Sequence, residues 1–294
     1  MFRFIHAEKA NHSVSVMCQV LEVSRSGYYA WAGRGPSARA RTDAALLKDI
    51  VEVHDQSRER YGAPRVHAEL RDGRGVRVSR KRVARLMSKH GLSGRCGRLP
   101  GPKTTRRDHE AEPALPDLVG RNFTAEAPNR VWAADITYVR TWQGWLYLAC
   151  VIDLYSRKVV GWAMADHMRA ELVCEATRMA IDRRRPEAGL IFHSDRGSQY
   201  LSGAHRELLA EYGARQSVGA VGVCWDNAVA ESFWATLKCE LVYTMSFATR
   251  EDAAVEIFNY IEGFYNRRRR HSSLGYVSPL DFEKRNSIIE EVAA

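Results

Sequence analysis

Apolar positions in the first part of the chain recur at helical spacing. Val16, Val20 and Val23 share one helical face, and residues 24–27 supply turn and cap residues that would end this helix. A second amphipathic helix is predicted at residues 43–54, where apolar and charged positions separate onto two faces. The chain is therefore expected to begin with a small helical region.

Residues 61–92 are predicted to form two short helices around a glycine-containing turn. Pro64 suits the first turn of one helix, and Ser79 can cap the other. The second helix has a basic face, formed by Arg80, Lys81, Arg82, Arg85 and Lys89. This pattern is typical of a helix-turn-helix that docks on DNA. A basic helical hairpin packed on the catalytic core would give the same pattern, so both interpretations stay open.

The pattern changes after residues 93–128, which hold five of the nine prolines and little hydrophobic periodicity. Beyond this stretch, β-branched and aromatic residues predict strands at 130–140, 145–154, 158–165, 190–194 and 215–218. Helices are predicted at 169–184, 203–212, 227–242 and 250–265. Three strands joined by short turns, followed by alternating helices and strands, form an α/β order.

That order is the order of the ribonuclease-H-like fold. The predicted fold class is α/β: a ribonuclease-H-like catalytic core with a mixed five-stranded sheet and helices, preceded by a small helical, helix-turn-helix-like DNA-binding region. Four segments follow from the pattern: a helical region expected to bind DNA at 1–92, a proline-rich linker at 93–128, a ribonuclease-H-like core at 129–243, and a C-terminal helical extension with a basic turn at 244–294.

The charge of the chain is unevenly distributed. The formal net charge is +9, but residues 1–107 hold 23 Lys and Arg against 9 Asp and Glu, whereas residues 108–294 hold 21 against 26. A strongly basic first part is typical of a protein with a polyanionic partner, and nucleic acid is the partner that this distribution favours.

Cysteine spacing and apolar runs exclude several protein classes. The six cysteines include no CxxC pair, so a disulfide framework and a zinc finger are both disfavoured. The longest apolar run, residues 145–152, is far shorter than the roughly 20 residues that span a bilayer. The first residues lack the apolar stretch of a signal peptide. We therefore expect a cytoplasmic protein with no membrane partner.

Three acidic residues stand where α/β proteins place catalytic side chains. Asp135 lies in the middle of a predicted strand, where burial is costly unless the carboxylate is paired or binds a metal. Asp195 follows an apolar strand, and the ends of such strands often form ligand sites. Glu231 lies on a predicted helix, two turns before Lys238 on the same face. Each acid alone is more often a cap or a solvated side chain, but the three together favour a catalytic site.

Carboxylates without histidine or cysteine partners suit hard cations such as Mg²⁺ or Mn²⁺. Two such ions about 4 Å apart are well suited to in-line displacement at phosphorus. The residues therefore predict a two-metal site held by Asp135, Asp195 and Glu231, with Mg²⁺ or Mn²⁺ as the cofactor.

Four sequence blocks carry a family resemblance: WAADITYV, HSDRGSQY, CWDNAVAESFWATLKCEL and YNRRRRHSSLGYVSPLDFE. They resemble successive blocks of bacterial insertion-sequence transposases of the IS-three family, in its second-frame, integrase-like product. The resemblance covers roughly residues 10–286, and Asp195 and Glu231 have the 35-residue spacing of that branch of the DDE integrases.

The resemblance implies that Asp135, Asp195 and Glu231 are the DDE residues and that Lys238 contacts DNA near the cut. It also implies cleavage at element ends to expose a 3′-hydroxyl, strand transfer and a circular intermediate. The implied partners are double-stranded DNA of the element ends and the target, further copies of this chain, and a helix-turn-helix and leucine-zipper protein from an upstream frame. The implied location is the bacterial cytoplasm, in association with the nucleoid. Residues 217–222 depart from the family pattern, since glycine, alanine and valine replace basic and hydroxyl residues.

Other candidates have structural interpretations. Asp153 is interpreted as a turn residue, Asp226 as part of the cap of the Glu231 helix, and His193 as a structural or supporting residue of the site rather than a metal ligand. One group of aromatic residues is expected to serve core and hairpin packing rather than base stacking: Trp132, Tyr138, Trp142, Trp145 and Tyr147.

The basic turn of the C-terminal extension is formed by Arg267, Arg268, Arg269 and Arg270. Four consecutive arginines cannot all face one way, so some should be exposed. Phosphate contact is favoured because the adjoining helix should pack beside the catalytic helix, whereas a solvated turn is the simpler alternative.

Two alternatives to a transposase remain open. A nuclease of the same fold would hydrolyse DNA without joining it. A catalytically impaired DNA-binding regulator derived from a transposase would bind DNA without cutting, and the altered stretch at 217–222 is the feature that favours it.

Overall fold

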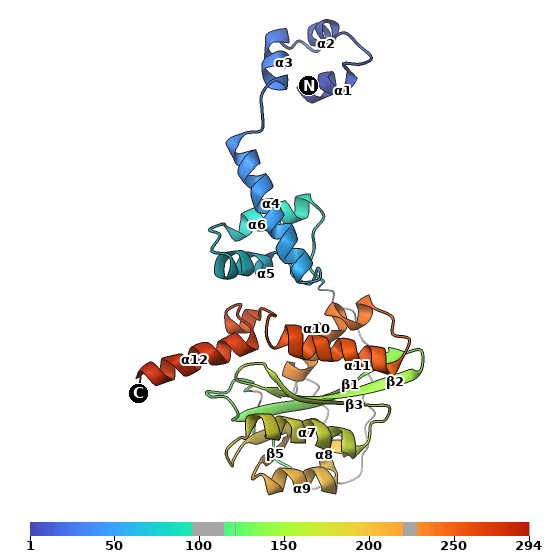
Figure 1. Cartoon of the computed structure of the whole chain (residues 1–294), viewed down its shortest axis with the longest axis vertical. Helices are drawn as coiled ribbons and strands as arrows, with labels where there is room; N and C mark the ends of the chain where they lie inside the picture. The colour runs from blue at the N-terminus through green and yellow to red at the C-terminus, as the bar shows by residue number, and fades with distance from the viewer. Residues whose placement is uncertain (96–114, 121, 220–227, 294) are drawn as a thin grey trace.

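The computed structural model describes residues 1–95, 115–120, 122–219 and 228–293, with side chains to residue 287. Three helices form a small group at the start of the chain: α1 (Phe2–Glu8), α2 (Val14–Val20) and α3 (Arg25–Ala32). Figure 1 shows this group at one end of the molecule, joined to the rest by an extended stretch before α4. The sequence pattern did not predict α1.

A second helical group follows, made of α4 (Ala38–Gln56), α5 (Ala63–Ala68), the π-helix η1 (Glu69–Gly73) and α6 (Arg80–Lys89). Helix α4 begins five residues before the predicted start, because Ser37 caps it by accepting from the N–H of Ala40. Ser79 caps α6 as predicted, by accepting from the N–H of Arg82. Apolar side chains of α4, α5 and α6 form one buried cluster.

The catalytic core is built on one sheet of five strands in the order β3-β2-β1-β4-β5. Their bounds are β1 (Val131–Thr141), β2 (Gly144–Asp153), β3 (Val159–Ala165), β4 (Ile191–Ser194) and β5 (Arg215–Val218). The first three strands are antiparallel, and β4 and β5 join parallel to β1. This mixed sheet has the predicted ribonuclease-H-like order, and each predicted strand lies within one or two residues of an observed one.

Helices cover both faces of the sheet (Figure 1). One face packs against α7 (Ala170–Arg184), with α8 (Ser198–Leu201) and α9 (Gly203–Glu211) beside it. The other face packs against α10 (Ala228–Glu240) and α11 (Arg250–Phe258), which a 3-10 turn, η3 (Val242–Thr244), connects. The alternation of side chains along β1 and β2 therefore fills two separate cores.

The chain continues from α11 into a π-helix, η4 (Asn259–Tyr265), so the single predicted helix at 250–265 has two parts. After the basic turn, η5 (Ser272–Leu274) and α12 (Pro279–Ala293) complete the chain. No helix within the described ranges is long and apolar enough to cross a membrane. The division into four segments at the predicted boundaries stays a prediction.

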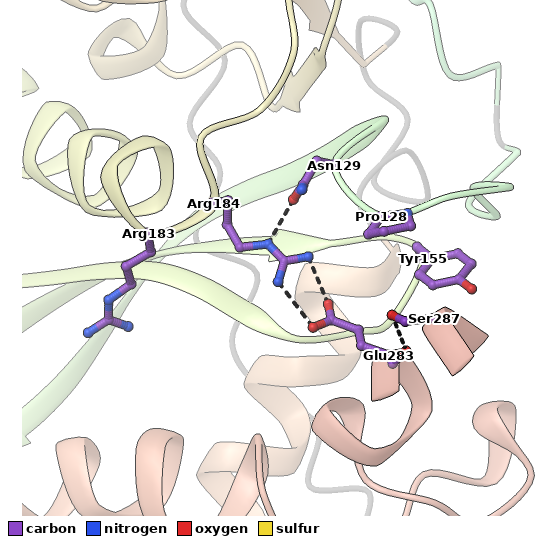
Figure 2. A pocket seen from close by; sticks show the side chains of 7 residues that line it. All are labelled: Pro128, Asn129, Tyr155, Arg183, Arg184, Glu283 and Ser287. Carbon is purple, nitrogen blue, oxygen red and sulfur yellow. Dashed lines mark hydrogen bonds and ion pairs between the residues drawn. The ribbon is translucent and has the colours of Figure 1, made fainter. Parts of the chain in front are cut away.

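An ion-pair cluster holds α12 against the core, beside a pocket of about 210 Å³ (Figure 2). The Glu283 carboxylate of α12 accepts from both terminal nitrogens of Arg184 at 2.8 and 3.0 Å, and from Lys158 Nζ at 2.9 Å. Arg184 also reaches Asp153 at 3.3 Å and Asn129 at 2.8 Å. The arginine at the end of α7 thus connects the sheet to the last helix.

Candidate active site

Asp135 lies in the middle of β1, opposite Cys150 of the neighbouring strand β2. Its carboxylate accepts two hydrogen bonds, from the backbone N–H of Ile136 at 2.8 Å and from the indole Nε1 of Trp234 at 2.9 Å. Trp234 belongs to α10, so this bond ties the catalytic helix to the sheet. The sequence analysis missed Trp234, although its position three residues after Glu231 was a usable signal, because residues i and i+3 share a helical face.

Asp195 follows β4 directly, and the sheet register places it beside Asp135. In the parallel pair β1–β4, Ala133 lies opposite His193, so two further residues along each strand lead to Asp135 and Asp195. The Asp195 side chain is exposed, and its Oδ1 accepts from the N–H of Gly197 at 3.0 Å. This turn holds the carboxylate at the open edge of the sheet.

Glu231 lies in the first turn of α10, with an exposed side chain. The helix buries Ala230, Phe233 and Leu237 against the sheet, as the sequence pattern predicted. Glu231 therefore faces away from this apolar contact. It lies near enough to Asp135 for its charge to raise the pKa of that residue.

The three acids influence one another electrostatically. Burial, then the charge of Asp195 and more weakly that of Glu231, raises the pKa of Asp135 to about 7, against the two hydrogen bonds it accepts. Partial loss of solvent around the carboxyl groups also raises the pKa of both Asp195 and Glu231, although each residue keeps an exposed surface. Within the described ranges no three acidic, histidine or cysteine side chains lie close enough to hold a metal ion. The carboxylates are therefore neighbours at one edge of the sheet and do not form a closed set of ligands.

Lys238 lies two turns after Glu231 on α10 and places its Nζ 5.2 Å from the centre of the Tyr138 ring. Burial lowers the pKa of Lys238, and the charge of Asp135 opposes that effect. The lysine is therefore near enough to the carboxylates to respond to their charge, which suits a residue that would contact a phosphate at this edge.

The basic residues of α6 divide into two pairs. Arg80 and Lys81 are exposed. Arg82 and Arg85 both bind the carboxylate of Asp43 on α4, each at 2.7 Å. The first pair stays available to a phosphate backbone, whereas the second pair already holds α4 against α6.

The four consecutive arginines also divide. Arg267 and Arg268 are exposed, as expected for part of the turn. Arg270 donates to Glu69 at 2.6 Å and to the carbonyl of Tyr276 at 2.8 Å. This pairing connects the C-terminal extension to the helical group that precedes the core.

Arg269 is buried, and we correct the expectation that it contacts phosphate. Its guanidinium makes a bidentate pair with Glu240, the closest distance being 2.7 Å, and Glu240 is only 2% exposed. Glu240 also accepts from the Tyr260 hydroxyl at 2.8 Å and lies 3.6 Å from Arg65, while Arg60 donates to its carbonyl at 3.1 Å. The end of the catalytic helix is thereby joined to the DNA-binding region and to the C-terminal extension.

Asp153 accepts from the N–H of Tyr155, as a turn residue would, and pairs with Arg184, which the sequence did not predict. His193 Nδ1 lies 2.9 Å from the Ser217 hydroxyl.

Trp142 is 81% exposed at the turn between β1 and β2, so the expectation of core or hairpin packing is wrong for this residue. Asp226 and the altered residues 220–222 lie outside the described residues.

Family models match three parts of this chain. An "Integrase core domain" model matches residues 125–224, a second model of that description matches 212–279, and an "HTH-like domain" model matches 41–98. The matched ranges contain all three acids, most of α4, and the whole of α5 and α6. The class is thus an integrase-core protein with an HTH-like domain.

Known relatives align along almost the whole chain. The insertion element IS600 uncharacterized 31 kDa protein of Shigella sonnei is 44% identical over 92% of this chain and 98% of its own length. The transposase InsF for insertion sequence IS3A of Escherichia coli (strain K12) is 42% identical over 96% of this chain and 98% of its own. The chain belongs to the IS3 family of insertion-sequence transposases.

Solved structures show weaker similarity. The catalytic core domain of BIV integrase has a TM-score of 0.41 and 17% identity over 55% of this chain and 99% of that chain. A simian T-cell lymphotropic virus intasome in complex with a PP2A regulatory subunit has a TM-score of 0.45 and 12% identity. The match covers 80% of this chain and 74% of that chain.

Proposed function

We propose that this transposase cuts the ends of an insertion sequence and joins them to target DNA, with Asp135, Asp195 and Glu231 as its catalytic carboxylates. The observation that carries the proposal is their placement: the parallel register of β1 and β4 sets Asp195 beside Asp135. The pKa of Asp135 agrees with this placement, since burial and then the charges of Asp195 and Glu231 raise it. Membership in the IS3 family supplies the reaction class. The geometry adds which side chains would perform it.

The donor set fits Mg²⁺ or Mn²⁺. The three acids offer oxygen donors only, which hard divalent cations prefer, and within the described ranges no Lys or Arg forms an ion pair with any of them. When bound, two such ions would activate the attacking hydroxyl and stabilise the leaving oxygen. We expect closure of the site to need the DNA or the cation itself, because the carboxylates are not gathered into a ligand group.

The residues around the acids have separate tasks in this proposal. Trp234 donates to one Asp135 oxygen and the N–H of Ile136 donates to the other, so both bonds would fix the orientation of the carboxylate toward a cation. Gly197 fixes the orientation of Asp195 through its N–H. Lys238 contributes a positive charge for the phosphate beside the cut.

DNA is proposed to contact the exposed basic residues first. Arg80 and Lys81 on α6, and Arg267 and Arg268 in the C-terminal turn, stay free of the ion pairs that occupy Arg82, Arg85, Arg269 and Arg270. Further copies of the chain and an upstream-frame partner complete the proposed assembly, which would act on DNA in the bacterial cytoplasm and nucleoid.

The test uses the full chain with labelled duplexes that carry the element's terminal sequence, in Mg²⁺ or Mn²⁺. Joined products support a transposase. Hydrolysed ends without joined products would replace it with the nuclease alternative. Binding without cleavage, unchanged by Asp195→Asn, would replace it with the regulator alternative.

A further inference from the structure

Two aromatic side chains meet beside the catalytic edge of the sheet. Tyr138 lies on β1, three residues beyond Asp135, and Trp145 lies at the start of β2. Their rings are in edge-to-face contact, with centroids 4.9 Å apart. Trp145 is 45% exposed. Much of its indole surface therefore faces solvent rather than a core.

One cation lies over a ring of this pair, and two more belong to neighbouring positions of the fold. Lys238 Nζ lies 5.2 Å from the centre of the Tyr138 ring. Arg140 is the register partner of Trp145 across the β1–β2 hairpin and is exposed. Arg250, at the start of α11, donates through Nε to the carbonyl of Trp145 at 3.0 Å. The positive groups come from three separate elements, the β1 strand and the helices α10 and α11.

Hairpin packing explains the contact between the two rings, but it does not explain why one indole stays exposed while a lysine lies over the neighbouring tyrosine ring. Aromatic faces flanked by cations are the usual device for holding single-stranded nucleic acid: bases stack on the rings, and the cations neutralise the backbone. Within a double helix each base is stacked on both faces, so an unpaired nucleotide is the ligand that fits this surface better than the interior of a duplex.

We propose that Tyr138, Trp145 and Lys238 form a binding site for an unpaired base of the DNA end that this enzyme cuts. The inference rests on the proposed function, because it places that base a short distance along β1 from Asp135. The site would stabilise a locally opened DNA end, and an opened end brings its phosphodiester within reach of the carboxylates.

The experiment measures binding of the full chain to two labelled duplexes by fluorescence anisotropy. One duplex is blunt, and the other carries a short single-stranded thymine tail. Trp145→Ala removes the exposed ring, and Trp145→Phe restores an aromatic face. Tyr212→Ala is the matched control, because Tyr212 is an aromatic residue of similar exposure, 40%, at the end of α9.

The wild-type chain is expected to prefer the tailed duplex, and Trp145→Ala should weaken that binding roughly tenfold, the loss typical of one stacked base. The affinity of Trp145→Ala for the blunt duplex should equal that of the wild type. Trp145→Phe should recover most of the affinity for the tailed duplex, and Tyr212→Ala should leave the affinity for both duplexes unchanged. Equal affinity of the wild type for both duplexes, or an equal loss on both, would overturn the site. Strand transfer by the wild type tests the proposed function separately.

Discussion

Acidic residues in two regions of the catalytic core have opposite surroundings. At the edge of the sheet, burial and then the charge of Asp195 raise the pKa of Asp135 to about 7. Beside α12, burial raises the pKa of Glu283, but Arg184 and Lys158 outweigh it and bring the pKa below its ordinary value. Among the described residues, the fold pairs Glu283 with its own arginine and lysine but provides no such partner for Asp135, Asp195 or Glu231, which suits their proposed role of binding a cation.

The two glutamates of helix α10, Glu240 and Glu231, also differ in whether the fold supplies a positive partner. Glu240 ends α10, nine residues after Glu231, and it is buried among Arg269, Arg65 and Tyr260. Glu231 on the same helix is exposed and forms no ion pair within the described ranges. One end of α10 therefore holds domains together while the other is available for chemistry.

The largest expected effect is on catalysis. Asp195→Asn keeps the shape of the side chain but removes a charged oxygen donor, so strand transfer should fall by roughly a thousandfold or more in a gel assay of joined products. The melting temperature should stay the same or rise slightly, because Asp135 loses a repelling charge. Glu187→Gln, at an exposed pair with Arg130, is the control and should remain active. Full activity of Asp195→Asn would show that the acids at the sheet edge are not reserved for catalysis.

The next effect is on stability. Glu240→Ala leaves Arg269 buried without its partner, and removing one member of a buried pair costs about 3–5 kcal/mol. Urea denaturation monitored by tryptophan fluorescence measures the loss. Glu256→Ala removes an exposed pair with Arg58 and should cost no more than about 1 kcal/mol. Equal losses for the two variants would show that burial of Glu240 is not what stabilises the domain contact.

A third effect depends on pH. Without divalent ions, the free energy of unfolding should decrease as pH rises from about 4 to about 7, because folded Asp135 keeps a proton that the unfolded chain releases. Asp135→Asn should remove up to about 4 kcal/mol of this decrease. Chemical denaturation at several pH values, with EDTA and then with Mg²⁺, measures it. The same dependence of the free energy of unfolding on pH in the wild type and in Asp135→Asn would contradict the raised pKa of Asp135.

The smallest effect is at α12. Glu283→Gln retains the side-chain shape but weakens the pairs with Arg184 and Lys158, for an expected loss of about 1–3 kcal/mol. Amide hydrogen exchange should accelerate in α12 and leave the β1–β2 hairpin unchanged. Uniform acceleration over the whole core, or none in α12, would show that this cluster does not anchor the last helix.

Much of the fold and the identity of the site residues could be predicted from sequence. Alternating and helical periodicities located all five strands, and the cap Ser79 marks a helix start where the structure has it. Residues 24–27 were expected only to end a helix, whereas Ser24 caps the start of α3. Asp135 and Asp195 could be chosen because each stands in or directly after a strand whose neighbours are apolar, and parallel strands bring such positions together.

The sequence by itself determined these local features because periodicity and capping act between residues a few positions apart. Only the tertiary structure decided which charges meet: Arg269 with Glu240, Arg270 with Glu69, and Arg184 with Glu283 are separated by 29, 201 and 99 residues. No local pattern encodes such pairs, since any arginine can satisfy any carboxylate that folding brings near. For the same reason, four arginines alike in sequence became two exposed side chains, one buried partner of Glu240 and one link between domains.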